Sequence, residues 1–233
     1  MDLDFTKKSE VKVTMADYTK ECIKIFDKVA PLEMGTKSSA AASNLFEVDE
    51  DSEKLSPRKA EAFHSLVAKH LFATKRAIPD TGLLILFLTT RVRDPSKQDW
   101  KKLVHLFKYL RGTQDIPLIL RADGSGILKW CVDVSHRVHP TMRGHTGGGL
   151  TMGTGFPVST STKHKLSTRS STETEIVGVD GCIPGVLWTR LFLEAQDYGV
   201  KENIVFQDNK ALPLFSNSMT VLLSWNTIFS LTP

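Results

Sequence analysis

Cysteine is scarce in this sequence, and there is no long hydrophobic run. The three cysteines among 233 residues, Cys22, Cys131 and Cys182, lie far apart and show no C-x-x-C spacing. This argues against a disulfide framework or a cysteine-based zinc site and fits a reducing compartment. The first 20 residues have no apolar signal-peptide core, and Gly82 to Leu88 is too short to span a bilayer. We therefore expect no membrane association, and a cytoplasmic or nuclear location.

The composition is that of a folded protein of one or two domains, with 41% hydrophobic and 24% charged residues. The formal net charge is only +4, but the stretch from Arg91 to Arg111 is strongly basic. Its cations Lys97, Lys101, Lys108 and Arg111 would suit a nucleic-acid phosphate backbone. The alternative is an ordinary solvated helix face.

The first half of the chain has mainly helical patterns. A short strand is expected at 11–13, and apolar residues at helical spacing follow from Tyr18 to Val29. Further helices should begin near Ser56 and at Asp94-Pro95, the second ending at Gly112, which suits a helix C-cap. Periodicity does not settle whether 83–88 is helix or strand. The acidic, Ser/Ala-rich segment 36–57 is expected to be an exposed loop without order.

After Thr113 the pattern changes to strands, which places a domain boundary near 112–116. Strands are expected at 117–121, 127–134, 147–152, 156–162 and 204–207, with a helix at 175–196 that Pro184-Gly185 should kink or split. Strands followed by a helix and a further strand predict a mixed sheet flanked by helices, an α/β domain.

Three carboxylates occupy positions that suggest two-metal chemistry. Asp133 ends a strand, Glu175 opens a helix and Asp208 ends another strand. Carboxylates placed in this way can converge on two divalent cations for phosphodiester cleavage, and oxygen ligands suit Mg²⁺. The structural alternative is a capping box from Thr172 to Glu175, with Asp208 in a turn and Asp133 merely a surface carboxylate.

Longer motifs carry a resemblance to a known family. They are Lys108-Tyr109-Leu110-Arg111-Gly112-Thr113, Val132-Asp133-Val134-Ser135, Ser170-Ser171-Thr172-Glu173-Thr174-Glu175 and Gln207-Asp208-Asn209-Lys210. The chain resembles the C-terminal part of Ty/copia-type retrotransposon polyproteins, namely the end of the reverse transcriptase followed by ribonuclease H, over roughly 8–215.

The resemblance implies a ribonuclease H-like α/β fold at 113–216, preceded by a mostly helical reverse-transcriptase thumb or connection segment at 1–112. It implies that Asp133, Glu175 and Asp208 bind two Mg²⁺ ions, for which Mn²⁺ could substitute, with Glu173 as the alternative ligand. The reaction would be hydrolysis of the RNA strand of an RNA–DNA hybrid, and the rest of the polyprotein would be a partner.

The histidines His136, His139, His145 and His164 match no zinc spacing and are interpreted as polar loop residues.

The sequence also departs from the family. No Tyr-x-Asp-Asp polymerase motif is present, and nothing after Lys210 is charged. The uncharged tail at 217–233 replaces the basic, His-containing continuation that leads to a fourth metal ligand, as a frameshift or decayed reading frame would. Two alternatives to a nuclease therefore stay open: a catalytically dead nucleic-acid-binding module and a decayed retroelement relic.

Overall fold

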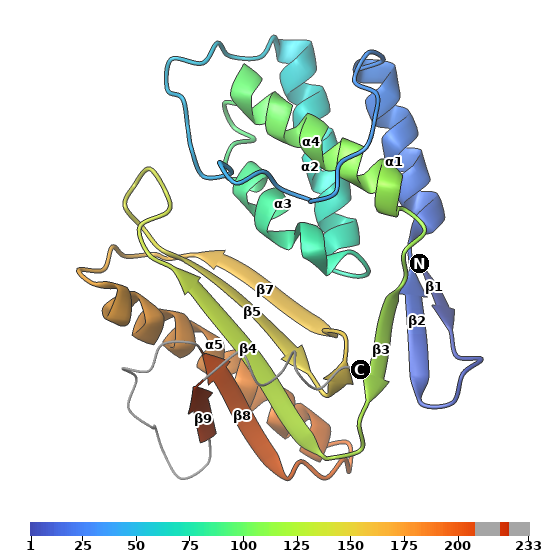
Figure 1. Cartoon of the computed structure of the whole chain (residues 1–233), viewed down its shortest axis with the longest axis vertical. Coiled ribbons are helices and arrows are strands. Elements are labelled where there is room, and N and C mark those ends of the chain that lie inside the picture. The colour runs from blue at the N-terminus through green and yellow to red at the C-terminus, as the bar shows by residue number, and fades with distance from the viewer. Residues whose placement is uncertain (208–219, 224–233) are drawn as a thin grey trace. The chain divides into compact units, whose positions relative to one another are not determined.

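The computed structural model describes residues 1–207 and 220–223. It divides the chain into two compact units, one from Met1 to Ile119 and the other from Leu120 onward. Figure 1 shows that the first is mostly helical and that the second is built on a sheet. Each unit has its own hydrophobic core.

The first unit combines a β-hairpin with four α-helices. The antiparallel strands β1 (Asp2–Asp4) and β2 (Glu10–Thr14) precede α1 (Ala16–Val29). The remaining helices are α2 (Pro57–Thr74), a 3-10 turn (Pro79–Thr81), α3 (Gly82–Thr89) and α4 (Lys97–Thr113). Ser96 and Asp99 form a capping box at the start of α4.

The short helix α3 occupies the stretch whose state periodicity could not settle. Leu84, Ile85, Phe87 and Leu88 are all buried in the first unit's core. A helix that is apolar on nearly every side shows no amphipathic period, and here even the exposed position, Leu83, is apolar.

The segment at 36–56 has no helix or strand, but the expectation that it lacks order is wrong. Its backbone bonds α4 at two distant points, Lys37 N to Lys108 O and Lys97 N to Glu53 O. Leu45, only 4% exposed, enters the core. The acidic composition suggested a solvated linker, but these acids and carbonyls lie against the lysines of α4 and are satisfied there.

The second unit is a mixed sheet with one long helix. Its main sheet has the order β7 (Val158–Lys163), β5 (His145–Thr151), β4 (Ile127–Ser135), β8 (Glu202–Gln207) and β9 (Thr220–Leu223). The β7–β5–β4 pairs are antiparallel, whereas β4–β8 and β8–β9 are parallel. Two further strands, β3 (Leu118–Ala122) and β6 (Gly153–Thr154), pair antiparallel. This is the mixed α/β fold that was predicted, and it is compatible with a ribonuclease H-like architecture.

The helix α5 (Ser171–Glu194) lies along one face of the main sheet, behind it in the view of Figure 1. Val179, Cys182 and Val186 pack with Trp130 and Val132 of β4. Pro184 lies inside this helix and does not split it, contrary to one of the two expected outcomes. Pro184 lacks the N–H that would bond back to Asp180, and the rest of the helix continues around that gap.

Among the described residues, α5 is also the one helix that is long and apolar enough for a membrane span, with 24 residues and a mean hydropathy of 1.4 over an 18-residue stretch. A core helix of a soluble protein meets the same two criteria. Here one side of α5 belongs to the core, and the other exposes Leu187, Trp188 and Leu191.

Candidate functional site

Two strands, β4 and β8, end at one edge of the second unit's sheet, and the helix α5 begins at the same edge. The parallel register of β4 and β8 runs from Ile127 opposite Glu202 to Cys131 opposite Phe206, so both strands end at the same edge. The helix α5 begins there too, because His136, directly after β4, bonds through Nδ1 to Thr174 Oγ1 at 2.6 Å. This edge carries the residues that the sequence motifs singled out.

Glu175 is buried at this edge, with only 8% of its surface exposed. Gln207, the last residue of β8 and itself fully buried, donates its side-chain amide to Glu175 Oε2. A buried carboxylate needs such donors, because burial removes the water that would otherwise solvate its charge. Gln207 Oε1 has no hydrogen-bond partner within the described part of the chain. The site therefore presents an acceptor oxygen that is still unsatisfied beside a carboxylate.

The two glutamates of the motif have different surroundings. Ser170 is the N-cap of α5, and its Oγ accepts from Glu173 N at 3.1 Å. The Glu173 carboxylate is exposed and accepts from the backbone N–H of Arg169 at 2.7 Å. The helix is thus capped by Ser170 and Glu173, and the capping box considered for Thr172 and Glu175 is not formed. The cap assigns Glu173 a structural contact, whereas Glu175 turns toward the sheet.

Asp133 lies near the end of β4, opposite Gly147 of β5. It is exposed and forms no hydrogen bond or ion pair with any described residue. The next residue, Val134, points toward α5, since a Cβ built on Gly178 of α5 would lie 2.4 Å from Val134 Cγ2. Successive side chains along a strand point to opposite faces of the sheet. The structure therefore turns Asp133 to the opposite face and does not bring it into contact with Glu175.

Asp208, the third predicted ligand, lies outside the described residues. In the sequence it follows Phe206 by two positions, as Asp133 follows Cys131, and Cys131 and Phe206 are register partners. It also directly follows Gln207, the residue that bonds Glu175.

The described residues contain no group of three His, Cys, Asp or Glu side chains placed to hold a metal ion. Their oxygen donors nevertheless suit Mg²⁺ in kind, since carboxylate and amide oxygens are the ligands of hard cations. The unsatisfied Gln207 Oε1 beside Glu175 fits the same chemistry.

The basic residues predicted on α4 are largely paired within the first unit. Lys97 bonds Glu53, Lys108 bonds Glu33 at 2.9 Å, and Arg111 bonds Asp27. Lys101, by contrast, is exposed and has no ion pair among the described residues. The segment at 36–56 supplies part of this neutralisation, and sequence reading missed it because the partners are 44 or more positions apart.

Three of the four histidines interpreted as polar loop residues, His139, His145 and His164, are buried in the second unit. His136, His139 and His164 do lie in loops, whereas His145 is the first residue of β5, so the interpretation is wrong for His145 alone. His145 bonds His139 through Nδ1 at 3.1 Å and Ser161 Oγ through Nε2 at 2.6 Å. His164 bonds Thr146 Oγ1 at 2.6 Å. Burial lowers the pKa of both His139 and His145 to about 4, with the charge of Lys163 acting in the same direction. These rings are neutral structural groups near pH 7.

Sequence reasoning also missed Gln207 as part of the site. The available signal was a polar residue that closes an apolar strand directly before the Asp208-Asn209 turn. Such a residue is ordinarily solvated, but Gln207 is buried and bonded to Glu175 of α5.

Comparison with known proteins supports a retrotransposon origin. The chain is similar to the retrovirus-related Pol polyprotein from transposon TNT 1-94 of Nicotiana tabacum, with 26% identity over 159 residues. The matched region is 67% of this chain and 12% of that polyprotein, so the chain spans a small part of its relative. No protein-family profile matches the chain, and no solved structure matches it.

Proposed function

We propose that the second unit is a retrotransposon-derived ribonuclease H-like nuclease that hydrolyses the RNA strand of an RNA–DNA hybrid. Asp133, Glu175 and Asp208 are its proposed metal-binding carboxylates. The observation that carries the proposal is the buried hydrogen bond from Gln207 to Glu175. It holds a carboxylate of α5 against the last residue of β8, and Asp208 is the next residue in the sequence. The polyprotein relative and the mixed α/β fold support it.

When bound, Mg²⁺ would supply the charge that activates a water molecule and stabilises the leaving 3′ oxygen. The chain's own residues prepare the site. Gln207 orients the Glu175 carboxylate, and burial restricts that side chain to few rotamers. The Ser170 and Glu173 cap fixes where α5 begins, and hence the position of Glu175, two residues after Glu173. Asp133 is exposed and would meet substrate from the face of β4 opposite α5.

The discriminating experiment is cleavage of an end-labelled RNA–DNA hybrid by the purified chain in Mg²⁺ or Mn²⁺. Asp133→Asn and Glu175→Gln should each abolish cleavage, because each removes a charged ligand while retaining its shape. Asp180→Asn is the matched control, since Asp180 is an exposed acid on the same helix with no hydrogen bond or ion pair among described residues. Glu173→Gln should retain cleavage, because glutamine can still accept from the Arg169 N–H.

Loss of cleavage in Glu173→Gln but not in Glu175→Gln would overturn the assignment of the glutamates. A folded parent chain that binds the hybrid without cutting it would favour the second candidate, a catalytically dead nucleic-acid-binding module. The exposed Asp133, turned away from Glu175, is the observation that favours this candidate. A chain without a cooperative melt would instead be a decayed relic.

A further inference from the structure

Five cations gather beside the candidate site without acidic partners. They come from the loop at 136–144, the end of β7 and the loop at 164–170: Arg137, Arg143, Lys163, Lys165 and Arg169. None of them forms an ion pair with a described residue, in contrast to the cations of α4. Arg137, Lys165 and Arg169 are exposed, and the other two are half-buried.

The sheet register explains why segments separated in sequence meet here. Ser135 at the end of β4 pairs with His145, and His145 pairs with Lys163 at the end of β7. The two loops therefore leave the sheet at the same edge, next to the start of α5. This is also the edge at which β4 ends two residues after Asp133.

The two loops are tied to each other. The Arg137 guanidinium donates to the carbonyl of Thr168 at 3.4 Å, and Ser167 Oγ donates to Thr141 O at 3.4 Å. Arg137 itself has a left-handed backbone, with φ of 52°. A bulky residue adopts that conformation only where its surroundings hold it. The cations thus project from a connected surface rather than from two independent loops.

Like charges repel across this surface. The pKa of Lys163 is lowered, first by burial and then by the nearby charge of Arg143. Cations held close together without acids create a positive potential that favours a polyanion. The acids that adjoin these loops in sequence are Asp133 and Glu173, and Glu173 is engaged by the Arg169 backbone.

We infer that the loops at 136–144 and 164–170 form a phosphate-binding surface that holds the backbone of a nucleic-acid duplex beside the candidate carboxylates. The partner is a double-stranded nucleic acid recognised through its phosphates, independently of base sequence. This inference deepens the proposed function and rests on it for the choice of partner. It also replaces α4 as the expected binding face, because three of the four predicted α4 cations already have acidic partners in the chain.

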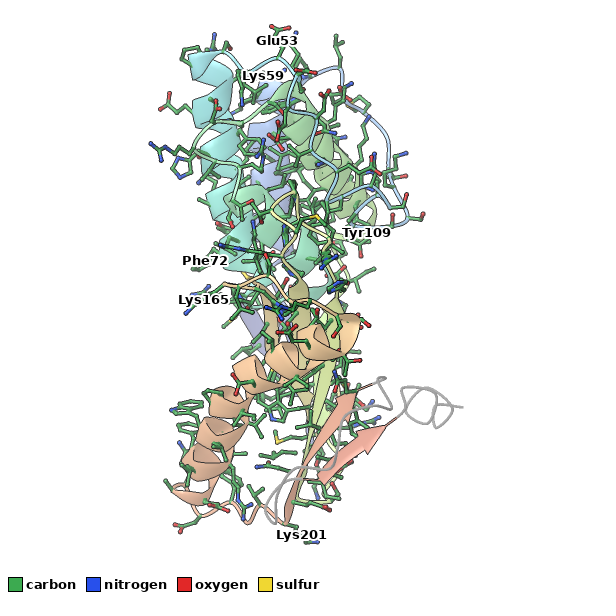
Figure 2. All side chains as sticks on the ribbon, turned by 90° about the vertical axis from the view of Figure 1, so that its left-hand side faces the viewer. Glu53, Lys59, Phe72, Tyr109, Lys165 and Lys201 are labelled. Carbon is green, nitrogen blue, oxygen red and sulfur yellow. The ribbon has the colours of Figure 1, made fainter. Side chains whose placement is uncertain are left out.

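The test measures binding in the absence of catalysis, so the binding surface can be established even if the chain does not cleave the hybrid. Fluorescence anisotropy of a labelled RNA–DNA hybrid in EDTA, over a series of salt concentrations, gives affinity and salt dependence for the full chain. The test variant is Arg143→Glu with Lys165→Glu. The matched control is Lys101→Glu with Lys201→Glu, which changes the net charge equally. Figure 2 shows Lys165 and Lys201 at opposite ends of the second unit.

The test variant should bind roughly tenfold more weakly at about 0.1 M salt, with a salt slope reduced by about 1 for each phosphate that the protein no longer neutralises. The control should bind as the parent does. Circular dichroism and a thermal melt establish that both variants are folded. Equal decreases in affinity for the two variants, or a decrease only for the control, would overturn the inference. So would binding to vesicles containing phosphatidylserine in the absence of duplex binding. Binding that depends on these loops without any cleavage would leave the surface established and remove the nuclease proposal alone.

Discussion

Gln207, the last residue of β8, donates its side-chain amide to the buried carboxylate of Glu175 on α5. This bond joins the end of a strand to the first turns of a helix that lies 32 residues earlier in the chain. It gives Glu175 a fixed direction at the candidate site. It also makes the two side chains energetically dependent on each other.

A double-mutant cycle should detect that dependence. Gln207→Ala removes the donor and leaves a buried carboxylate less satisfied, which should cost roughly 1–3 kcal/mol of unfolding free energy. Glu175→Ala should cost less once Gln207 is already alanine, with a coupling of about 1 kcal/mol. Urea unfolding of the parent, the two single variants and the double variant measures it. Strict additivity would show that the two side chains do not interact in solution.

The start of α5 can be tested by comparing two hydroxyl residues. Ser170→Ala should destabilise the chain by about 1 kcal/mol, because Ser170 Oγ accepts from Glu173 N at the helix terminus. Thr172→Ala should have little effect, since Thr172 lies within the first turn and alanine has the higher helix propensity. A larger loss of melting temperature for Thr172→Ala than for Ser170→Ala would indicate that Thr172 and Glu175 cap the helix instead.

Two glycines of α5 should respond to alanine in opposite directions. A Cβ on Gly178 would lie 2.4 Å from Val134 Cγ2 and 2.9 Å from Thr146 Oγ1, so Gly178→Ala should destabilise by roughly 1–3 kcal/mol through overpacking. A Cβ on Gly181 would meet nothing within 4 Å. Gly181→Ala should therefore stabilise by roughly 0.5–1 kcal/mol, the helical advantage of alanine over glycine. Similar shifts in both melting temperatures would contradict the close packing of α5 on β4.

Much of the fold was predictable because its signals are local. Apolar runs indicated β4 and β8, and an apolar stripe at helical spacing after Asp94-Pro95 indicated α4. The helix begins at Lys97 and continues through Gly112, its expected C-cap, to Thr113. The order at 36–56 was not predictable. It depends on Leu45 entering the core and on contacts with α4 that are distant in sequence, and the local acidic composition favours a solvated chain instead.

The site was predictable only in part, because local motifs can be read from the sequence and long-range contacts cannot. The motif around Glu175 identified a helix start, but its two glutamates could be told apart only by what each one touches. The cations of α4 appeared available for a ligand because their acidic partners are far away in sequence. The cations of the loops at 136–144 and 164–170 are scattered in sequence, and only the register of β4, β5 and β7 brings them together.

The burial of Leu45 predicts a large cost for its truncation. Leu45→Ala should destabilise the first unit by roughly 2–5 kcal/mol and expose 36–56 to limited proteolysis, because the anchor of that segment is removed. Leu32→Ala is the matched control, since Leu32 is 94% exposed and should tolerate the change. Equal, slight effects of the two substitutions would restore the interpretation of 36–56 as an unanchored linker.

The buried His70 on α2 should make the first unit acid-sensitive. Burial lowers its pKa from 6.5 to about 4. Thr81 Oγ1 donates to the carbonyl of Ile78, so the hydroxyl accepts from His70 Nε2, while the buried Nδ1 has no hydrogen-bond partner among the described residues. Protonation of Nδ1 would create a buried charge with no acceptor.

Because the unfolded chain binds this proton at the higher pH, the stability contributed by neutral His70 is complete above pH 6.5. It is lost progressively as the pH falls toward 4, by roughly 3 kcal/mol in total. His70→Gln should flatten the dependence of unfolding free energy on pH across this window by that amount, measured by urea unfolding at pH 7, 6, 5 and 4. The remaining slope then includes His139 and His145, whose pKa burial also lowers to about 4, together with the carboxylates that titrate near the acid end of the window. An unchanged slope in His70→Gln would show that the ring is already solvated, and that the contacts of α2 with Thr81 do not enclose it.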